Sequence, residues 1–196
     1  MATPLLRAEP IDLTCWAGLL SPETCAQLIH LARERLQTAQ VSDEHTGENV
    51  PHGARISEMA WPRREDFPVL QELAKGVARL VGTDVACLEP LQILHYRPGG
   101  EYQPHFDAFA ANSPTLSQGG NRQWTLILYL NAVEGGGETA FPELGLRIFP
   151  IPGAGVLFRN LETSGQRDPL SLHAGLPVLK GEKWIATQWI RQGPYV

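Results

Sequence analysis

The chain has few cysteines, no basic cluster and no long apolar stretch, and each shortage excludes a class of protein. Its three cysteines, Cys15, Cys25 and Cys87, are odd in number and lack the spacing of a metal site, so a disulfide framework is not expected. The net charge is −5, which argues against a long phosphate-binding surface and hence against a nucleic-acid partner. No apolar stretch reaches the length of a membrane span, so no membrane partner is expected.

The first residues also lack the pattern of a secretory signal. Met1-Ala-Thr-Pro-Leu-Leu-Arg7 has no basic segment followed by an apolar run of the required length. Together with the low cysteine content, this leads us to expect a cytoplasmic protein. The sequence gives no indication of the oligomeric state.

The bulk composition is that of an ordinary globular protein. Of the 196 residues, 43% are hydrophobic and 19% are charged, which is enough apolar material for a sizeable core. No internal repeat, low-complexity tract or linker interrupts the chain. We therefore expect one domain over residues 1–196.

The first half of the chain carries two helix signals. Ser21-Pro22-Glu23 combines an N-cap, a proline at the first helical position and an acid in the first turn, and predicts a helix that fades near Gln40. A second helix is predicted to open at Asp66-Phe67-Pro68 and to end at Gly82. The polar, turn-rich segment 41–61 between them is typical of a lid or binding loop. Residues 1–87 are thus expected to form a helical support with a candidate lid.

From Leu88 onward the sequence is typical of β structure. Short β-rich runs are separated by Gly/Pro turns, at 91–96, 124–131, 138–141, 146–149, 155–158, 173–177 and 184–191. Many short strands of this kind favour a double-sheet jelly roll. We predict a mainly β (α+β) fold in which residues 88–196 form the jelly-roll core and the two helices pack on one face of it.

His105 and Asp107 are the first candidate site residues. On a β-strand, residues two apart point to the same face, so this pair could present an imidazole and a carboxylate together. With His173 from farther along the chain, they would make a 2-His-1-carboxylate triad, which leaves three adjacent positions open on Fe(II). A buried core histidine and a turn aspartate are the alternative explanation of the pair.

The segments around these residues resemble the prolyl 4-hydroxylase branch of the Fe(II)/2-oxoglutarate-dependent dioxygenase superfamily. The resemblance runs from about Leu91 to Arg191. It rests on His95-Tyr96-Arg-Pro-Gly-Gly-Glu-Tyr-Gln-Pro-His105-Phe-Asp107, on Glu134-Gly-Gly-Gly-Glu-Thr-Ala-Phe-Pro142, and on His173 followed ten residues later by Lys183. It implies a double-stranded β-helix (cupin-like) core, iron ligation by His105, Asp107 and His173, and the use of 2-oxoglutarate and O2. Ascorbate is a candidate further cofactor.

Lys183 is predicted to bind the distal carboxylate of 2-oxoglutarate, as the resemblance also implies. A lysine is rarely buried unless it is paired with an anion. If Lys183 points inward on a strand, Ile185, Thr187 and Trp189 point the same way. Lys180 is the alternative anchor, although it is expected at an exposed turn.

Three further residues are predicted near the cosubstrate. Tyr129 is expected to join Lys183 at the distal carboxylate, with a core tyrosine as the alternative, and Thr187 is expected to assist. Tyr96 matches a family position close to 2-oxoglutarate.

The substrate-binding residues are less strongly indicated. Arg55, in the candidate lid, and Arg122, just before a central strand, could each grip a substrate carboxylate or carbonyl bidentately. A structural ion pair would explain each arginine equally well. Trp189 either stacks on the substrate or packs near the metal end of the barrel.

The leading functional hypothesis is a hydroxylase that acts on prolyl residues of a peptide or protein and releases succinate and CO2. A second hypothesis keeps the cofactor chemistry and replaces the peptide with a free amino acid or small natural product, because fold does not fix substrate. A third hypothesis is a non-catalytic barrel that binds a metal or ligand.

Overall fold

The computed structural model describes residues 2–38, 41–42, 49–50 and 55–195, so much of the predicted lid lies outside the described residues. The described part is mainly β, as predicted. Its strands are β1 (Thr3–Ala8), β2 (Leu13–Ala17), β3 (Gln37–Thr38), β4 (Val41–Ser42), β5 (Asn49–Val50), β6 (Glu58–Ala60), β7 (Gln92–Tyr96), β8 (Tyr102–His105), β9 (Arg122–Tyr129), β10 (Gly135–Gly136), β11 (Thr139–Phe141), β12 (Leu146–Ile148), β13 (Gly155–Arg159), β14 (His173–Gly175), β15 (Val178–Lys180) and β16 (Lys183–Arg191). The α-helices are α1 (Pro22–Arg33) and α2 (Pro68–Val81), and short 3₁₀ turns occur at Glu9–Ile11, Arg64–Asp66, Val85–Cys87, Pro114–Ser117, Pro142–Leu144 and Pro169–Ser171.

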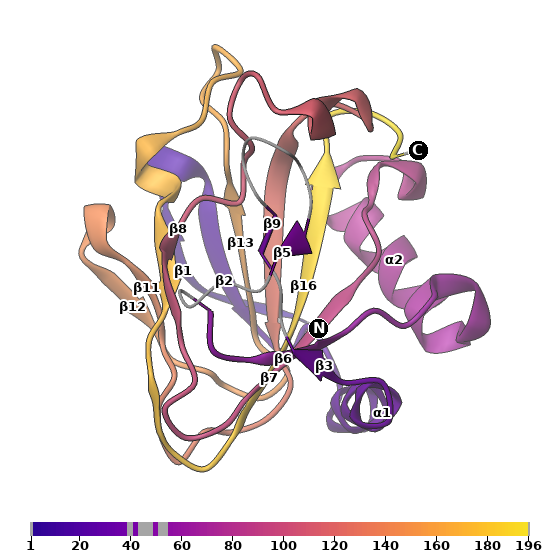
Figure 1. Cartoon of the computed structure of the whole chain (residues 1–196), viewed down its shortest axis with the longest axis vertical. Helices are drawn as coiled ribbons and strands as arrows, with labels where there is room; N and C mark the ends of the chain where they lie inside the picture. The colour runs from indigo at the N-terminus through magenta and orange to yellow at the C-terminus, as the bar shows by residue number, and fades with distance from the viewer. Residues whose placement is uncertain (1, 39–40, 43–48, 51–54, 196) are drawn as a thin grey trace.

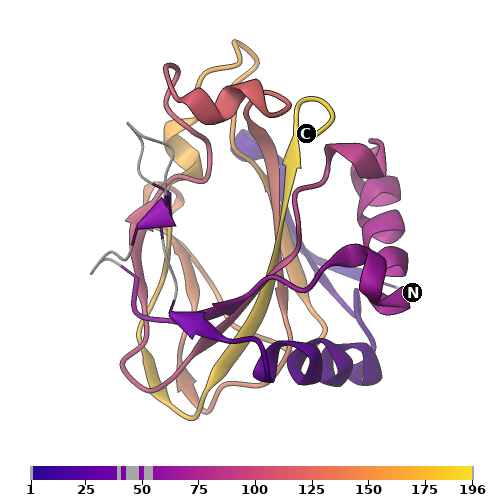
Figure 2. The same ribbon diagram turned by 45° about the vertical axis from the view of Figure 1, so that its right-hand side comes forward.

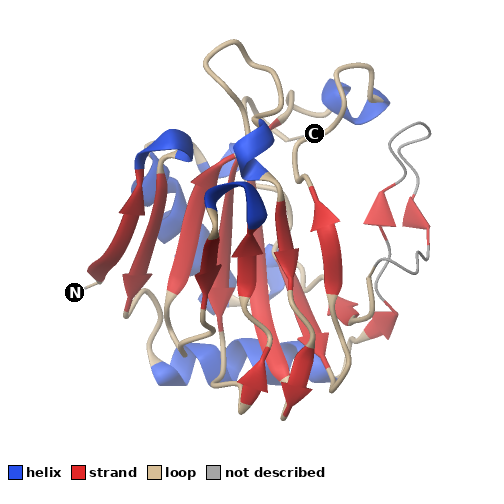
Figure 3. Cartoon of the chain, turned by 90° about the vertical axis from the view of Figure 1, so that its left-hand side faces the viewer, coloured by secondary structure: helices blue, strands red, loops and turns tan. Residues whose placement is uncertain are grey.

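Two antiparallel sheets form the frame. The larger has eight strands in the order β1-β2-β13-β9-β16-β7-β6-β3, and the smaller has four in the order β12-β11-β14-β8. The smaller sheet lies across one face of the larger (Figure 3), while both helices lie on the other side (Figures 1 and 2). Two facing antiparallel sheets with crossing connections make a jelly roll, so the predicted fold class and the position of the helices are confirmed.

Helix α1 begins where its sequence predicts and ends earlier. The Ser21 hydroxyl accepts a hydrogen bond from the Thr24 amide (3.1 Å), and Pro22 occupies the first turn. The predicted end near Gln40 was wrong, because the helix stops at Arg33. Shortly afterwards Gln37–Thr38 pairs with β6 as the edge strand β3, and this sheet pairing replaces further helical turns.

Helix α2 matches its predicted bounds. Gly82 follows it with φ of 70°, a left-handed conformation that glycine adopts without strain. The buried faces of α1 and α2 share one apolar core with the outer face of the large sheet. Leu126 and Leu128 of β9 belong to that core.

A second core lies between the two sheets, and strand β9 separates it from the first. Ile127 and Tyr129 alternate with Leu126 and Leu128 and face the second core, where Phe141 is also buried. The interior face of β9 therefore looks into the jelly roll. This is the face on which the candidate site is built.

The N-terminal segment differs from the prediction in one respect. The sequence predicts an irregular entry over residues 1–20 with a possible short strand around Ile11–Trp16. Strand β2 lies at that place, but β1 was not expected, and the two pair as a hairpin that extends the large sheet beyond β13.

Cys15, Cys25 and Cys87 are buried free thiols. Within the described residues, neither helix has the length and apolar character needed to cross a bilayer.

Candidate metal centre and cosubstrate pocket

Two histidines from distant parts of the sequence meet in the smaller sheet. His105 ends β8 and His173 opens β14, and the two are direct partners in the β8–β14 ladder. Their ring centroids are 4.3 Å apart. Strand pairing therefore fixes the position of one imidazole relative to the other.

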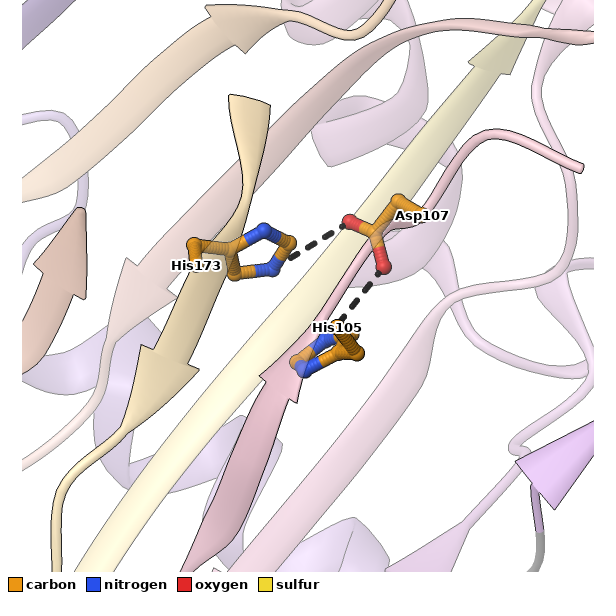
Figure 4. A group of neighbouring side chains, drawn as sticks. All are labelled: His105, Asp107 and His173. Carbon is orange, nitrogen blue, oxygen red and sulfur yellow. Dashed lines mark ion pairs between the residues drawn. The ribbon is translucent and has the colours of Figure 1, made fainter. Parts of the chain in front are cut away.

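Asp107 completes the cluster from just beyond the strand. Strand β8 ends at His105 and Asp107 lies in the following bend, so the expectation that both residues share one strand face was only partly right. The Asp107 carboxylate oxygens nevertheless lie 3.7 Å from Nε2 of His105 and 3.6 Å from Nε2 of His173. Figure 4 shows the three side chains converging, and their potential ligand atoms all lie within 4.8 Å of one another.

Backbone carbonyls set the tautomer of both rings. Nδ1 of His105 lies 2.8 Å from the carbonyl oxygen of Gln103, and Nδ1 of His173 lies 3.0 Å from that of Ser171. A carbonyl only accepts hydrogen bonds, so each Nδ1 carries the proton. Each Nε2 then has its lone pair free and aimed at the cluster, which is the arrangement of a metal-binding histidine.

The carboxylate is oriented by a hydroxyl from β9. The Thr125 hydroxyl donates to Oδ2 of Asp107 (2.7 Å), and the Asn160 amide donates in turn to the Thr125 oxygen (2.8 Å). Burial by itself would raise the pKa of Asp107, but His173, His105, Arg122 and the Thr125 hydrogen bond together lower it to about 2. Asp107 is therefore ionised at neutral pH.

The charge states of the cluster suit a divalent metal. Burial, followed by the neighbouring His173, lowers the pKa of His105 to about 3, so this ring is neutral at neutral pH. Neutral imidazoles and an ionised carboxylate are the forms that bind metals. Two nitrogens and one oxygen from one side match the facial triad of a non-haem Fe(II) centre, which leaves positions open for further ligands.

Lys183 places a buried positive charge near this centre. Its side chain is only 1% exposed, and Nζ donates to the Gly137 carbonyl (2.8 Å) and lies 4.7 Å from the ring centroid of Tyr96. Burial lowers the pKa of Lys183 to about 8, while Glu138 acts in the opposite direction. At neutral pH the group is thus an ammonium with donors to spare. An anionic ligand would stabilise it.

A single pocket connects the metal cluster to Lys183. It is lined by Arg55, Gln92, Leu94, Tyr96, Tyr102, His105, Asp107, Ile127, Thr139, His173, Ala174, Gly175, Lys183, Ile185, Thr187 and Trp189. The inward alternation expected along β16, from Lys183 through Thr187 to Trp189, is what the structure shows. Tyr96 also lines the pocket, in register with Lys183 on the neighbouring strand.

Tyr129 is placed differently from the other predicted cosubstrate residues. Its hydroxyl donates to the Thr139 hydroxyl (2.8 Å), and Thr139, rather than Tyr129, lines the pocket. Direct contact of Tyr129 with a carboxylate stays a prediction. In this structure Tyr129 holds the side chain of Thr139, and Thr139 faces the pocket.

Arg122, the other arginine predicted to contact substrate, forms a bidentate ion pair in this structure. Its Nε and Nη2 donate to the two carboxylate oxygens of Glu89 (2.7 and 2.8 Å). Arg191 binds the same carboxylate, and the guanidinium carbon of Arg122 lies 3.6 Å from the ring centroid of Trp189. Glu89 thus occupies the Nε–Nη2 edge of Arg122 in this structure, and contact of Arg122 with substrate stays a prediction.

Arg55 and Trp189 both line the pocket and stay candidates for substrate contact. Arg55 donates to the Gln92 side chain (2.9 Å), and its guanidinium carbon lies 4.6 Å from the ring centroid of Tyr102. Trp189 is 7% exposed, and its ring centroid lies 6.1 Å from that of Trp61.

Sequence reasoning missed three polar residues of the site, Thr125, Gln92 and Thr139. The period-2 pattern could have found the first two, because Thr125 shares a face with Ile127 on β9 and Gln92 shares one with Tyr96 on β7. No sequence pattern predicts the place of Thr139 in the pocket, because that place depends on the contact of β11 with Tyr129.

Known proteins are similar to this chain in sequence and in fold. The family model described as the 2OG-Fe(II) oxygenase superfamily matches residues 91–191. The chain is 34% identical over 212 residues to probable prolyl 4-hydroxylase 3 of Arabidopsis thaliana, covering 98% of this chain and 73% of that protein. It is 36% identical over 177 residues to prolyl 4-hydroxylase subunit alpha-1 of Gallus gallus, covering 89% of this chain. That alignment spans about a third (34%) of the chicken protein.

A solved structure agrees with this relationship. The viral collagen prolyl hydroxylase vCPH from Paramecium bursaria Chlorella virus-1, in its 2OG complex, superposes with a TM-score of 0.72 at 31% identity, covering 91% of this chain and 95% of that one. The similarity thus includes the sequence, the fold and the region that contains His105, Asp107, His173 and Lys183. The chain belongs to the 2OG-Fe(II) oxygenase superfamily.

Proposed function

We propose that this protein is a dioxygenase that uses Fe(II), 2-oxoglutarate and O2 to hydroxylate prolyl residues in a peptide or protein. The observation that carries the proposal is the shared pocket, in which the His105–Asp107–His173 cluster and the buried ammonium of Lys183 face the same space. Several relatives are named as prolyl hydroxylases, which supports proline as the substrate class.

The residues of the pocket divide the work. His105, Asp107 and His173 would hold the iron from one side and leave its other side open to the pocket. Lys183 would bind the far carboxylate of 2-oxoglutarate and so fix its orientation. When bound, iron and cosubstrate supply the oxidising chemistry, in which one oxygen atom of O2 enters the substrate and the other enters succinate as CO2 leaves.

The protein contributes geometry and protection from water. The Nδ1 hydrogen bonds hold both imidazoles in the metal-binding tautomer, and Thr125 fixes the carboxylate of Asp107. The pocket walls are largely apolar beyond these groups, which limits side reactions with water. Trp189 and Arg55 line the pocket and are our candidates for contact with the prolyl ring and a peptide carbonyl.

Succinate formation coupled to peptide oxidation tests the proposal. Protein reconstituted anaerobically with Fe(II) and 2-oxoglutarate is started with O2, with and without a panel of proline-containing peptides. We expect peptide-stimulated succinate formation, a mass gain of one oxygen on proline, and loss of both in His173→Ala. Lys180→Ala, which alters an exposed lysine, is the matched control for Lys183→Ala. Turnover that no peptide accelerates would instead favour a free amino acid or small natural product.

Two accompanying proposals are tested in the same system. Ascorbate is proposed as a reductant that sustains turnover, and its omission should shorten the linear phase of succinate formation. A cytoplasmic location is also proposed, and localisation of a tagged full-length protein would check it.

A further inference from the structure

A histidine outside the pocket lies between two carboxylates. His95 of β7 is 4% exposed, and its ring stacks on that of Trp184 with centroids 4.1 Å apart. Nδ1 lies 2.9 Å from Oε2 of Glu58, and Nε2 lies 2.7 Å from Oε2 of Glu182. Both ring nitrogens are thus at hydrogen-bonding distance from a carboxylate oxygen.

This geometry indicates which groups of the cluster carry a proton. The His95 hydrogen bond lowers the pKa of Glu58; burial alone would raise the pKa of Glu182, but His95 lowers it overall. An ionised carboxylate only accepts hydrogen bonds, so each ring nitrogen of His95 has to donate. The arrangement is satisfied when His95 is an imidazolium, with a proton on Nδ1 and on Nε2.

Two arginines complete the charges around His95. Arg33 at the end of α1 donates to Oε1 of Glu182 (3.3 Å) and lies over the Trp184 ring, with its guanidinium carbon 5.1 Å from the centroid. Arg97, just after β7, donates to Oε2 of Glu58 (3.1 Å). Within the described residues, the charged groups that contact the cluster from α1, β6, β7 and β16 are these two arginines and the two glutamates.

The cluster adjoins the residue predicted to anchor 2-oxoglutarate. Glu182 directly precedes Lys183, and His95 directly precedes Tyr96. In the β7–β16 ladder His95 pairs with Trp184, and the next pair is Tyr96 with Lys183. The outer face of these two pairs carries the His95 cluster, and the inner face carries the pocket.

Hydrogen bonds hold the backbone on both sides of Lys183. The Asn131 side chain accepts from the Trp184 amide (2.6 Å) and donates to the Glu182 carbonyl (2.8 Å). The Glu182 side chain is held by His95 from the opposite strand. His95 therefore acts on the residue next to Lys183 without touching the pocket.

We propose that His95 is a positioning residue for Lys183, acting as an imidazolium that holds Glu58 and Glu182 and so fixes the end of β16 for 2-oxoglutarate binding. The inference rests on the proposed anchoring role of Lys183. Without the imidazole, neither carboxylate keeps its hydrogen bond at this point. Affinity for 2-oxoglutarate should then fall.

The test is calorimetric titration of 2-oxoglutarate into Mn(II)-loaded protein at neutral pH. Mn(II) suits nitrogen and oxygen ligands and permits binding without turnover. Four variants are compared with wild type: His95→Gln, Glu182→Gln, Glu134→Gln and Lys183→Met. Glu134→Gln is the matched control, since it alters an exposed ion pair with Lys180 in the same region.

Each variant has a distinct expected result. His95→Gln should weaken 2-oxoglutarate binding about 3- to 10-fold, in the range of a partly exposed ionic contact, while kcat of the Fe(II)-loaded protein at saturating 2-oxoglutarate stays within about twofold of wild type. Glu182→Gln should weaken binding less than His95→Gln does, because the amide oxygen still accepts a hydrogen bond from His95 but carries no charge. Glu134→Gln should bind 2-oxoglutarate as wild type does.

Other results would overturn the proposal. Unchanged affinity in His95→Gln or in Glu182→Gln would show that the cluster does not position Lys183. Lys183→Met separates this failure from failure of the anchor itself. If Lys183→Met binds 2-oxoglutarate as wild type does, the anchoring role is wrong, and the role of His95 is wrong with it.

Discussion

Replacing Lys183 with methionine should stabilise the ligand-free protein while it removes most of the affinity for 2-oxoglutarate. The ammonium of Lys183 is buried, with the Gly137 carbonyl as its hydrogen-bond acceptor among the described residues. Burial lowers its pKa from 10.5 to about 8. Folding without an anion therefore carries a cost at neutral pH, and methionine removes the charge while keeping a side chain of similar length.

The size of the effect follows from linkage. A pKa that falls from 10.5 to about 8 corresponds to about 3 kcal/mol of destabilisation below pH 8, at about 1.4 kcal/mol for each tenfold change in the equilibrium. The Gly137 carbonyl loses its donor in the variant, which costs about 1 kcal/mol. The net gain in the free energy of unfolding at pH 7 is thus about 2 kcal/mol.

The difference in stability between wild type and Lys183→Met should depend on pH. Between about pH 8 and about pH 10.5 the unfolded chain keeps the Lys183 proton that the folded chain has lost, so wild-type stability gains from this residue as pH rises. Lys183→Met lacks that contribution, and the difference between the two proteins should shrink over the same range. The variant should bind 2-oxoglutarate about 30- to 1,000-fold more weakly, because a buried charge-assisted contact is lost.

Urea unfolding of the metal-free proteins at pH 7 and at high pH measures the stabilities, and calorimetry measures 2-oxoglutarate binding to the Mn(II)-loaded proteins. Lys180→Met is the control, because Lys180 is exposed and pairs with Glu134 at the surface. It should change neither quantity appreciably. A Lys183→Met protein that is less stable than wild type at pH 7, or that binds 2-oxoglutarate normally, would refute the reasoning.

Three further substitutions test the roles of Thr125, Arg122 and Gly82. Thr125→Val removes the hydroxyl that donates to Asp107 and should weaken metal binding about tenfold, as measured by Mn(II) titration; unchanged affinity would contradict the orienting role. Arg122→Met leaves Glu89 with Arg191 alone and should lower the free energy of unfolding by about 2–3 kcal/mol, whereas a loss below about 1 kcal/mol would mean that the ion pair contributes little. Gly82→Ala places a Cβ in open space at φ of 70°, so only backbone strain of about 1 kcal/mol is expected; an unchanged thermal midpoint would argue against it.

Local signals in the sequence were sufficient for the elements whose causes are local. The Ser21 cap and Gly82 mark helix ends through their own backbone chemistry, and both lie where the sequence places them. The alternation along β16 and β9 follows from strand geometry alone. It correctly predicted that Lys183 points inward and that Tyr129 and Leu128 face opposite sides of the sheet.

Features that depend on tertiary pairing were not predictable in the same way. Helix α1 ends at Arg33 because Gln37–Thr38 joins the large sheet, and sheet partners cannot be read from this segment by itself. Asp107 converges with His105 through a bend rather than along a strand. The engagement of Arg122 by Glu89 joins residues from separate segments, and a single sequence does not reveal which acid an arginine will meet.

We propose that one pocket binds two partners. It holds a divalent metal through His105, Asp107 and His173, and it holds 2-oxoglutarate through Lys183. An anaerobic crystal structure with Mn(II) and 2-oxoglutarate tests it most directly. The account predicts a metal about 2.0–2.3 Å from Nε2 of both histidines and from one carboxylate oxygen of Asp107, with the distal carboxylate of the cosubstrate within hydrogen-bonding distance of Nζ of Lys183. A metal bound elsewhere, or a cosubstrate whose distal carboxylate lies away from Lys183, would contradict it.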